Sequence, residues 1–296
     1  MRYSKLIKNI QAYISLARLE KPIGVILLML PCWWGIALAT PPLTLPDPIL
    51  LIVFAWGAFF LRGAGCTYND YIDRNIDRQV ARTAFRPLAA KTINTQNAFY
   101  FLLIQLFLGA LTLCWLSPIA IVIALSSVVL VLLYPYMKRF TWWPQAFLGL
   151  TFNIGILVGY ATIRKNLDMS AWLLYGAGIS WTIIYDTIYA HQDREDDALI
   201  GVKSTARLFG QHSKIILGFF AFLLIGLLGG TLYISNPPSS HLVWIVVAGF
   251  IVLAGLLGRN IWSVNIHHPL SCLRAFRFHR WIGLAIFLLI IGSKFW

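Results

Sequence analysis

The chain consists mainly of long apolar runs that alternate with short polar segments. A helix needs about 20 apolar residues to cross the hydrocarbon core of a bilayer, which is roughly 30 Å thick. Nine runs approach that length, and each predicts a membrane-spanning helix. The predicted spans are residues 22–40, 48–68, 97–116, 118–136, 143–162, 171–190, 214–234, 241–259 and 279–295. The pattern predicts an all-α polytopic membrane protein, which we expect to form one domain over residues 1–296.

The composition supports this fold class. Hydrophobic residues make up 59% of the chain and charged residues only 12%, whereas about a quarter of the residues of soluble domains are charged. The four cysteines are widely spaced and form no C-x-x-C pair, so we interpret them as helix-packing residues. The basic segment before the first span is similar to the start of a signal peptide, but the span is too long for one and no A-x-A site follows. We therefore expect a retained first helix.

The positive charge follows the loops between the predicted spans. The net charge is +13, and 21 of the 24 Lys and Arg residues lie at the N-terminus or in alternate connections. This distribution is typical of membrane topology and argues against a nucleic-acid partner. By the positive-inside rule, the N-terminus is cytoplasmic, the C-terminus is outside, and the number of spans is odd.

A row of polar residues closes the second predicted span. Asn69, Asp73 and Asp77 follow one another at steps of four, which places three oxygen-bearing side chains on one face of a helix. Arg62 lies about two turns before Asn69 and projects from the same face. Carboxylates at this spacing repel one another, so we expect a positive group against them. Hard oxygen ligands at a membrane edge favour magnesium and phosphate chemistry.

The sixth predicted span ends in a second acidic stretch. Asp186, Asp193 and Asp197 repeat the spacing of seven and four found in the first stretch, which indicates a similar polar stripe on the same side of the membrane. Eight of the eleven Asp and Glu residues fall in these two clusters. A basic membrane protein that concentrates its acids at two points is most simply explained by a cation bound there.

These carboxylates could instead be solvated loop residues that pair with nearby arginines. Because they form two clusters on one side, we favour metal binding, with Mg²⁺ sharing a diphosphate between the clusters. Lys138 and Arg139, where the fourth span ends, could contact phosphate, although topology alone would also place cations there. We expect the remaining acids, Asp70, Glu195 and Asp196, to support the ligands indirectly or to face solvent.

Two further groups of residues have ordinary explanations. His267, His268 and His279 lack zinc-ligand spacing, and we expect them to face solvent or anionic headgroups. The paired tryptophans at 33–34 and 142–143 are typical of interfacial anchors in the membrane.

Six segments together resemble the UbiA-type intramembrane prenyltransferases. The resemblance covers most of the chain and weakens after about residue 215. The segments are R-x-x-K-P-I-G at 18–24, L-R-G-A-G-C-x-x-N-D-Y-x-D-R at 61–74, R-T-x-x-R-P-L at 82–88, Y-P-x-x-K-R at 134–139, Y-D-T-x-Y-A-x-x-D-R-x-D-D at 185–197 and I-G-V-K-S-T-A-x-L-F-G at 200–210.

The resemblance implies nine helices around a central cavity open to the bilayer, two aspartate-rich motifs and two Mg²⁺ ions. The implied metal ligands, which would also carry the catalysis, are Asn69, Asp73, Asp77, Asp193 and Asp197. The substrates implied are an allylic polyprenyl diphosphate and 4-hydroxybenzoate, in ubiquinone biosynthesis, with Arg18 as our choice for the acceptor's carboxylate. The other substrate-binding residues expected are Arg62, Asn69, Lys138, Arg139 and Asp186. We expect a bacterial inner membrane, with the site on its cytoplasmic side and lipid around the helices.

Two alternatives remain open from the sequence. A related prenyltransferase could use another acceptor, such as a naphthoate, although the Y-D-T-x-Y-A segment argues against this. A cation-coupled transporter would also carry membrane carboxylates, but transport acids usually lie near the bilayer midplane in broken helices. Here the acids lie at the ends of predicted spans.

Overall fold

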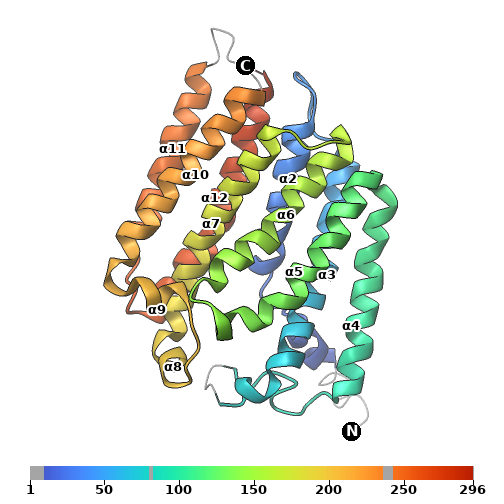
Figure 1. The fold of residues 1–296 in the computed structure, drawn as a ribbon, viewed down its shortest axis with the longest axis vertical. Coiled ribbons are helices and arrows are strands. Elements are labelled where there is room, and N and C mark those ends of the chain that lie inside the picture. The colour runs from blue at the N-terminus through green and yellow to red at the C-terminus, as the bar shows by residue number, and fades with distance from the viewer. Residues whose placement is uncertain (1–9, 80–82, 236–242, 296) are drawn as a thin grey trace. The chain divides into compact units, whose positions relative to one another are not determined.

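The structure is a computed structural model that describes residues 10–79, 83–235 and 243–295, and all regular structure within these ranges is helical. A helical stretch over residues 10–16 comes first. The elements that follow are α2 (Ile23–Ala39), α3 (Pro48–Asp77), α4 (Thr95–Ala110), η1 (Leu111–Trp115), α5 (Pro118–Phe140), α6 (Pro144–Arg164), α7 (Met169–Ala190), η2 (His191–Asp193), α8 (Arg194–Leu199), α9 (Thr205–Phe209), η3 (Gly210–His212), α10 (Ser213–Ser235), α11 (Val243–Ser263), α12 (Pro269–Gly292) and η4 (Ser293–Phe295) (Figure 1).

A helix occupies each of the nine predicted spans in the described part of the chain. Among the residues that the structure describes, seven helical segments are long and apolar enough to cross a membrane, so the chain is an integral membrane protein. The other two positions hold α2, which has 17 residues, and α7, which has 22 residues and includes Asp186 among several hydroxyl side chains. The count of nine spans and the orientation of the termini therefore stay predictions.

The last helix begins earlier than predicted. α12 starts at Pro269, where a proline is well placed in the first turn, rather than at residue 279. Arg274, Arg277 and Arg280 are exposed at helical spacing, while Cys272 and His279 lie on the opposite, buried face. The expectation that His279 faces solvent is wrong, because this face packs inside the protein and Nε2 of His279 lies 3.1 Å from Oδ1 of Asn260.

The chain forms two compact units. Unit 1 comprises Met1–Ile26 and Ile52–Cys114, and unit 2 comprises Leu27–Leu51 and Trp115–Trp296, both within the limits of the described residues. The two aspartate-rich stretches therefore belong to different units. The expectation of a single domain stays a prediction.

In unit 1, α3 and α4 pack closely because small residues face larger ones. A Cβ on Gly63 would lie 2.4 Å from Nε2 of Gln105, and one on Gly109 would lie 2.7 Å from Cδ2 of Leu61. Thr67 donates to Oε1 of Gln105 at 2.9 Å within this interface. Such close contact through small residues is the usual way for helices to associate in a bilayer.

In unit 2, α7 is the central helix and packs against α6, α10 and α12 (Figure 1). α2 approaches α6 so closely that a Cβ on Gly35 would meet the carbonyl oxygen of Ile156 at 2.1 Å. Trp34 is 1% exposed, stacks on Trp181 with ring centroids 4.8 Å apart, and donates to the carbonyl of Gly283. The interpretation of Trp34 as an interfacial anchor is therefore wrong, since tertiary packing has placed it in the core.

Three of the four cysteines are buried, as expected of helix-packing residues. Cys32, Cys66 and Cys272 are buried free thiols, and Cys114 is exposed and also free. A Cβ on Gly155 would lie 2.5 Å from Sγ of Cys32, so this thiol occupies the α2–α6 contact. The helix-packing interpretation does not hold for Cys114, which is exposed.

Candidate active site

The first aspartate motif lies at the C-terminal end of α3. This helix has 30 residues and runs without a break from its apolar part through Asp77, as the spacing of the polar residues predicts. Asp70 is 1% exposed, Asp73 is 0% exposed and Asp77 is 5% exposed. The alternative of solvated loop carboxylates is therefore wrong for this motif. Buried carboxylates need partners that replace water.

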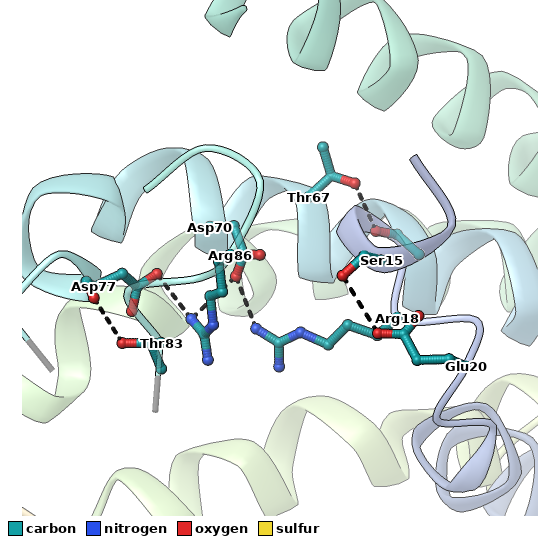
Figure 2. Close-up of polar contacts among 9 residues, drawn as sticks. Ser15, Arg18, Glu20, Thr67, Asp70, Asp77, Thr83 and Arg86 are labelled. Carbon is teal, nitrogen blue, oxygen red and sulfur yellow. Dashed lines mark hydrogen bonds and ion pairs between the residues drawn. The ribbon is translucent and has the colours of Figure 1, made fainter. Parts of the chain in front are cut away.

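Arginines from two other segments supply such partners (Figure 2). Nη2 of Arg18 lies 2.7 Å from Oδ1 of Asp70. Nη1 of Arg86 lies 3.1 Å from the same Asp70 oxygen and 2.8 Å from Oδ2 of Asp77. The positive group expected against the row of Asn69, Asp73 and Asp77 is thus confirmed for Asp77. Asp70, which we expected to play an indirect part, is the carboxylate that joins the two arginines.

The arginines nearest in sequence do not fill this role in the contacts seen. Arg74 donates to the carbonyl of Tyr71 at 2.6 Å, and Arg78 donates to the carbonyl of Ala89 at 2.9 Å. Both cations therefore bind backbone oxygens instead of the neighbouring acids. Distance along the chain is a poor guide to pairing here, because Arg74 lies four residues after Asp70, a spacing that allows contact on a helix, and yet bonds to a carbonyl.

Local backbone structure brings Arg18 and Arg86 to the end of α3. Arg18 has φ of 55° and ends the first helical stretch in a left-handed turn, which side chains other than glycine adopt only under constraint. After α3, Thr83 donates through Oγ1 to the carbonyl of Asp77 at 2.9 Å, and N–H of Arg86 donates to the carbonyl of Thr83 at 3.0 Å. Leu88 then enters a small core with Leu16, which fixes both segments.

Arg62 is placed by the glycine of the K-P-I-G segment. A Cβ on Gly24 would lie 2.5 Å from Nε of Arg62, so the guanidinium crosses directly over this residue. Arg62 therefore occupies space that any larger residue at position 24 would fill. Asn69 lies further along α3 and is partly buried. Arg82, in the R-T-x-x-R-P-L segment, lies outside the described residues.

The second aspartate stretch is not one continuous helix, so the single face predicted for it is wrong. Asp186 lies in α7, which ends at Ala190, and Asp197 lies in the short helix α8. Asp193 lies between them with φ of −111° and ψ of 10°, outside helical geometry. Asp193 and Asp197 are partly buried. Three acids lie in the first turn of α8, where the positive end of the helix dipole stabilises negative charge. This interaction favours the start of a new helix there.

Side-chain hydrogen bonds attach this broken segment to the rest of unit 2. The hydroxyls of Thr187 and Thr205 are 2.6 Å apart, and N–H of Thr205 donates to Oε1 of Gln145 at 3.0 Å. Nη1 of Arg207 donates to the carbonyl of Asp197 at 3.2 Å. The loop that follows Asp197 is thereby held on the buried side of α6 and α7.

The same loop contacts the end of α5. N–H of Lys203 donates to the carbonyl of Lys138 at 2.9 Å, and Nζ of Lys203 lies 3.2 Å from the carbonyl of Phe140. Lys138 is partly buried, whereas Arg139 is exposed and lies over the ring of Tyr136. Within unit 2, the structure thus brings the Y-P-x-x-K-R segment next to the loop that carries Asp197.

His191 stands at the break after α7. Its Nε2 lies 2.9 Å from Oγ of Ser213, which itself donates to the carbonyl of Gly210. Burial, together with the charges of Arg194 and His267, lowers the pKa of His191 to about 4. The imidazole is therefore neutral at physiological pH, and because Oγ of Ser213 donates to Gly210, the tautomer protonated at Nε2 suits the His191–Ser213 hydrogen bond. It is a structural contact of this turn that the sequence did not indicate.

The donor set at the two motifs suits Mg²⁺ but does not by itself form a complete site. Amide and carboxylate oxygens are the ligands that Mg²⁺ takes, usually few at a time, together with water and phosphate oxygens. Within residues 10–79, 83–235 and 243–295, no three His, Cys, Asp or Glu side chains are grouped to hold a metal ion. A site that combines the motifs of the two units therefore stays a prediction.

The protein is an integral membrane protein in which a long apolar helix ends in buried carboxylates that pair with arginines. Such a site can bind charged groups at the edge of the bilayer. The sequence of the chain matches the UbiA prenyltransferase family over residues 28–283. The chain belongs to this family.

The relatives and solved structures agree with this assignment. The mitochondrial 4-hydroxybenzoate polyprenyltransferase of Bos taurus is 46% identical over 288 residues, covering 97% of this chain and 76% of the relative. The enzyme of the same description from Homo sapiens is 43% identical over 290 residues, covering 98% and 77%. The apo structure of a UbiA homolog from Aeropyrum pernix K1 has a TM-score of 0.72 at 21% identity, covering 90% and 96% of the two chains. A UbiA homolog from Archaeoglobus fulgidus bound to GPP and Mg²⁺ has a TM-score of 0.67 at 16% identity, covering 95% and 99%.

Proposed function

We propose that this protein transfers a polyprenyl group from an allylic polyprenyl diphosphate to 4-hydroxybenzoate, in ubiquinone biosynthesis. The observation that carries the proposal is the 46% identity to a 4-hydroxybenzoate polyprenyltransferase over 97% of the chain. The buried carboxylates and arginines at the end of α3 support the chemistry, since they provide a charged site next to an apolar helix. Arginine side chains that bind carboxylates can also bind the oxygens of a diphosphate.

We propose Mg²⁺ as the cofactor, held by oxygen donors of both motifs. From the first motif these are Asn69 and Asp73, together with Asp77, which Arg86 already contacts. From the second they are Asp193 and Asp197. When bound, Mg²⁺ neutralises diphosphate oxygens and makes the diphosphate a better leaving group. The UbiA homolog from Archaeoglobus fulgidus with bound GPP and Mg²⁺ supports this choice of cofactor.

The cationic side chains bind the two substrates. Arg62, Lys138 and Arg139 stabilise the negative charge that grows on the diphosphate as the allylic carbon–oxygen bond breaks. Arg18, which also pairs with Asp70, binds the carboxylate of the acceptor. Asp186, near the end of α7, also binds substrate.

In the proposed reaction, a carbon–oxygen bond breaks and a carbon–carbon bond forms. The allylic carbon–oxygen bond breaks, and the electron pair leaves with the diphosphate. The ring carbon ortho to the acceptor's hydroxyl forms the new carbon–carbon bond, and loss of its proton restores aromaticity. Water must be kept out, because it would capture the allylic cation. The apolar helices and the lipid around them provide that environment and also accommodate the polyprenyl chain.

We propose nine membrane spans in one domain, with the N-terminus on the side that carries the basic loops and the active site. This is the cytoplasmic side if the membrane is a bacterial plasma membrane. The relatives that match most of the chain are described as mitochondrial, so their names do not support the bacterial part of this expectation.

Isolated membranes offered 4-hydroxybenzoate and a radiolabelled polyprenyl diphosphate test the proposal. We expect a prenylated 4-hydroxybenzoate that forms with Mg²⁺ and does not form with EDTA. A naphthoate offered in parallel tests the alternative acceptor. Turnover of the naphthoate in place of 4-hydroxybenzoate would contradict the proposed acceptor, and the absence of any Mg²⁺-dependent product would contradict the proposed reaction.

A further inference from the structure

An open hollow lies where α10 begins and α11 ends, at the end of unit 2 that carries α8 and α9 (Figure 1). Its volume is about 360 Å³. Five of the residues that line it have side chains that can donate hydrogen bonds, and none of the lining residues is an acid. These five are Gln211, Lys214, Ser263, Asn265 and His267. The hollow is therefore suited to an anion and not to a cation.

The helices around the hollow contain no carboxylate that could balance its charge. Residues 198–296, which include α9 to α12, contain eight Lys and Arg residues and no Asp or Glu. Among the residues that the structure describes, no ion pair joins Lys214 or His267 to a carboxylate. Nζ of Lys214 donates to the carbonyl of Trp262 at 2.9 Å, which uses one of the three N–H groups of the ammonium. The other two can bind an anion from outside these helices.

The loop that carries His267 is fixed by its own hydrogen bonds. N–H of Asn265 donates to Oγ of Ser271 at 3.0 Å, and N–H of His267 donates to Oδ1 of Asn265 at 3.0 Å. Val264, in the same loop, is buried. Donors on such a fixed loop lose little conformational freedom when a ligand binds. Membrane topology explains basic residues in this loop, but it does not require a hollow with ordered walls.

The helix surfaces beside the hollow are apolar and exposed. Ile215 directly follows Lys214 on α10, and Phe219 and Phe222 lie on the same face at helical spacing; all three apolar side chains are exposed. Trp262, near the end of α11, is exposed as well and is typical of the membrane interface. A ligand that fits both surfaces has an anionic head and long hydrocarbon chains.

We propose that this hollow binds the headgroup of an anionic phospholipid. Lys214 and His267 bind oxygens of the phosphate, Gln211 and Ser263 donate to the rest of the headgroup, and the acyl chains lie along the exposed face of α10. Basic pockets between membrane helices bind anionic headgroups in this way. None of the residues proposed to bind metal or substrate lines the hollow, so this inference does not depend on the proposed prenyl transfer.

Native mass spectrometry of the full-length protein in detergent measures lipid binding directly. Phosphatidylglycerol is the anionic probe, and phosphatidylcholine with the same acyl chains is the neutral one. We expect the wild type to bind phosphatidylglycerol about tenfold more tightly than phosphatidylcholine. Lys214→Gln should weaken the binding of phosphatidylglycerol about tenfold, because it removes a charged hydrogen-bond donor. Lys214→Arg keeps the charge and should bind within about twofold of the wild type.

Two further variants separate a specific site from general attraction to positive charge. Lys91→Gln is the matched control for charge, since Lys91 is also exposed but lies in unit 1 and outside the hollow. It should change the affinity for phosphatidylglycerol by less than about twofold, because salt screens distant charges. Ser263→Phe tests the shape of the site, since it fills the hollow and changes no charge. We expect it to weaken binding about tenfold.

Thermal unfolding provides a second measurement, because a lipid that binds the folded state raises its Tm. Phosphatidylglycerol should raise the Tm of the wild type and of Lys91→Gln more than that of Lys214→Gln. If near-UV circular dichroism shows that Lys214→Gln has lost its fold, His267→Gln replaces it, with an expected weakening of about threefold.

Four results would overturn the proposal. Equal losses in Lys91→Gln and Lys214→Gln would show that only the overall charge matters. Full binding by Ser263→Phe would place the lipid outside the hollow. Phosphatidylcholine that binds as tightly as phosphatidylglycerol would show that the charge of the headgroup is not recognised. Inorganic phosphate that displaces the lipid at equal concentration would identify free phosphate as the ligand instead.

Discussion

The two aspartate-rich regions hold their acids in different ways. At the end of α3, three carboxylates are almost fully buried on one unbroken helix, and arginines distant in sequence pair with two of them. After α7 the helix breaks, Asp193 and Asp197 are only partly buried, and hydrogen bonds of threonine, glutamine, Arg207 and backbone groups fix the segment. Arginines pair with carboxylates in the first region, whereas the hydrogen bonds described for the second include those of the neutral side chains Thr187, Thr205 and Gln145.

This difference indicates how each region should respond to change. A buried ion pair that loses one partner leaves an uncompensated charge behind, which is costly. A neutral hydrogen bond contributes only about 1 kcal/mol on balance. Mutations in the first region should therefore affect both stability and chemistry, whereas mutations in the hydrogen bonds of the second should have mild effects on stability. Replacement of a proposed metal ligand in either region should also lower turnover.

Loss of a proposed metal ligand from each region is expected to have the largest effect. Asp73→Ala and Asp193→Ala should each lower kcat by about 10²-fold to 10⁴-fold, because we propose that both motifs contribute ligands to the same Mg²⁺-dependent step. The measurement is the formation of prenylated 4-hydroxybenzoate by purified protein, with thermal unfolding as the control for the fold. Full activity in either variant would contradict the model of two cooperating motifs.

Asp70→Asn should be the most destabilising change in the first region. Oδ1 of Asp70 accepts from both Arg18 and Arg86. Replacing this carboxylate by an amide removes the negative charge that the two arginines share. We expect a loss of about 2 kcal/mol in the free energy of unfolding, less than for a fully buried pair because the arginines are partly exposed. Thr205→Val is the comparison from the second region, with an expected loss of about 1 kcal/mol. Equal losses would show that charge pairing does not distinguish the regions.

Gly24→Ala should disturb Arg62 without unfolding the protein. The new Cβ would lie 2.5 Å from Nε of Arg62, and the guanidinium can move aside at little cost in stability. Because Arg62 is proposed to bind the diphosphate, the displacement should lower kcat/KM about tenfold. Gly65→Ala, on the same helix as Arg62, is the matched control, since nothing lies within 4 Å of its added Cβ. A similar loss of activity in both variants would argue against a specific contact at Gly24.

The smallest expected effect lies outside both regions, at Asp168 between α6 and α7. Burial would raise the pKa of Asp168, but hydrogen bonds from Ser170 and Tyr160 and from the N–H groups of Ala171 and Ser170 outweigh it and hold the pKa below the ordinary 3.8. The folded state therefore binds this proton less readily than the unfolded chain does.

The stability that Asp168 contributes is thus present above pH 3.8 and is lost as the pH falls through the lower folded pKa. Asp168→Asn should lower the free energy of unfolding at neutral pH by about 1 kcal/mol and remove this part of the acid dependence. Thermal unfolding of both proteins over the acidic range checks the prediction. If the stability of wild type and Asp168→Asn depends on acidic pH in the same way, the pKa of Asp168 is the same in the folded and unfolded states.

The sequence predicted the helices and the first motif well because their signals are local. Long apolar runs specify membrane helices without reference to the rest of the chain. The four-residue spacing of Asn69, Asp73 and Asp77 is a property of one helix, and α3 indeed continues through all three. The R-T-x-x-R-P-L segment also contained Arg86, although it was recognised only as part of the family resemblance.

Features that depend on distant contacts were not predictable in this way. The break at Asp193 follows from contacts of His191 with Ser213 and of Thr187 with Thr205, and these lie in other elements. The pairing of Asp70 with Arg18 joins residues 52 positions apart. His279 and Trp34 are buried because neighbouring helices cover them, although their residue types are also common at membrane surfaces. Periodicity within one segment contains no information on such contacts.

The central claim is that the two motifs form one metal site for a diphosphate. The most direct measurement is anomalous scattering from Mn²⁺ in crystals of the protein grown with a non-reactive diphosphate analogue. Our account predicts metal peaks within about 2.2 Å of oxygens from Asp73 and from the Asp193–Asp197 segment, with the diphosphate bound between them. Peaks at one motif alone, or a diphosphate bound away from both, would contradict it.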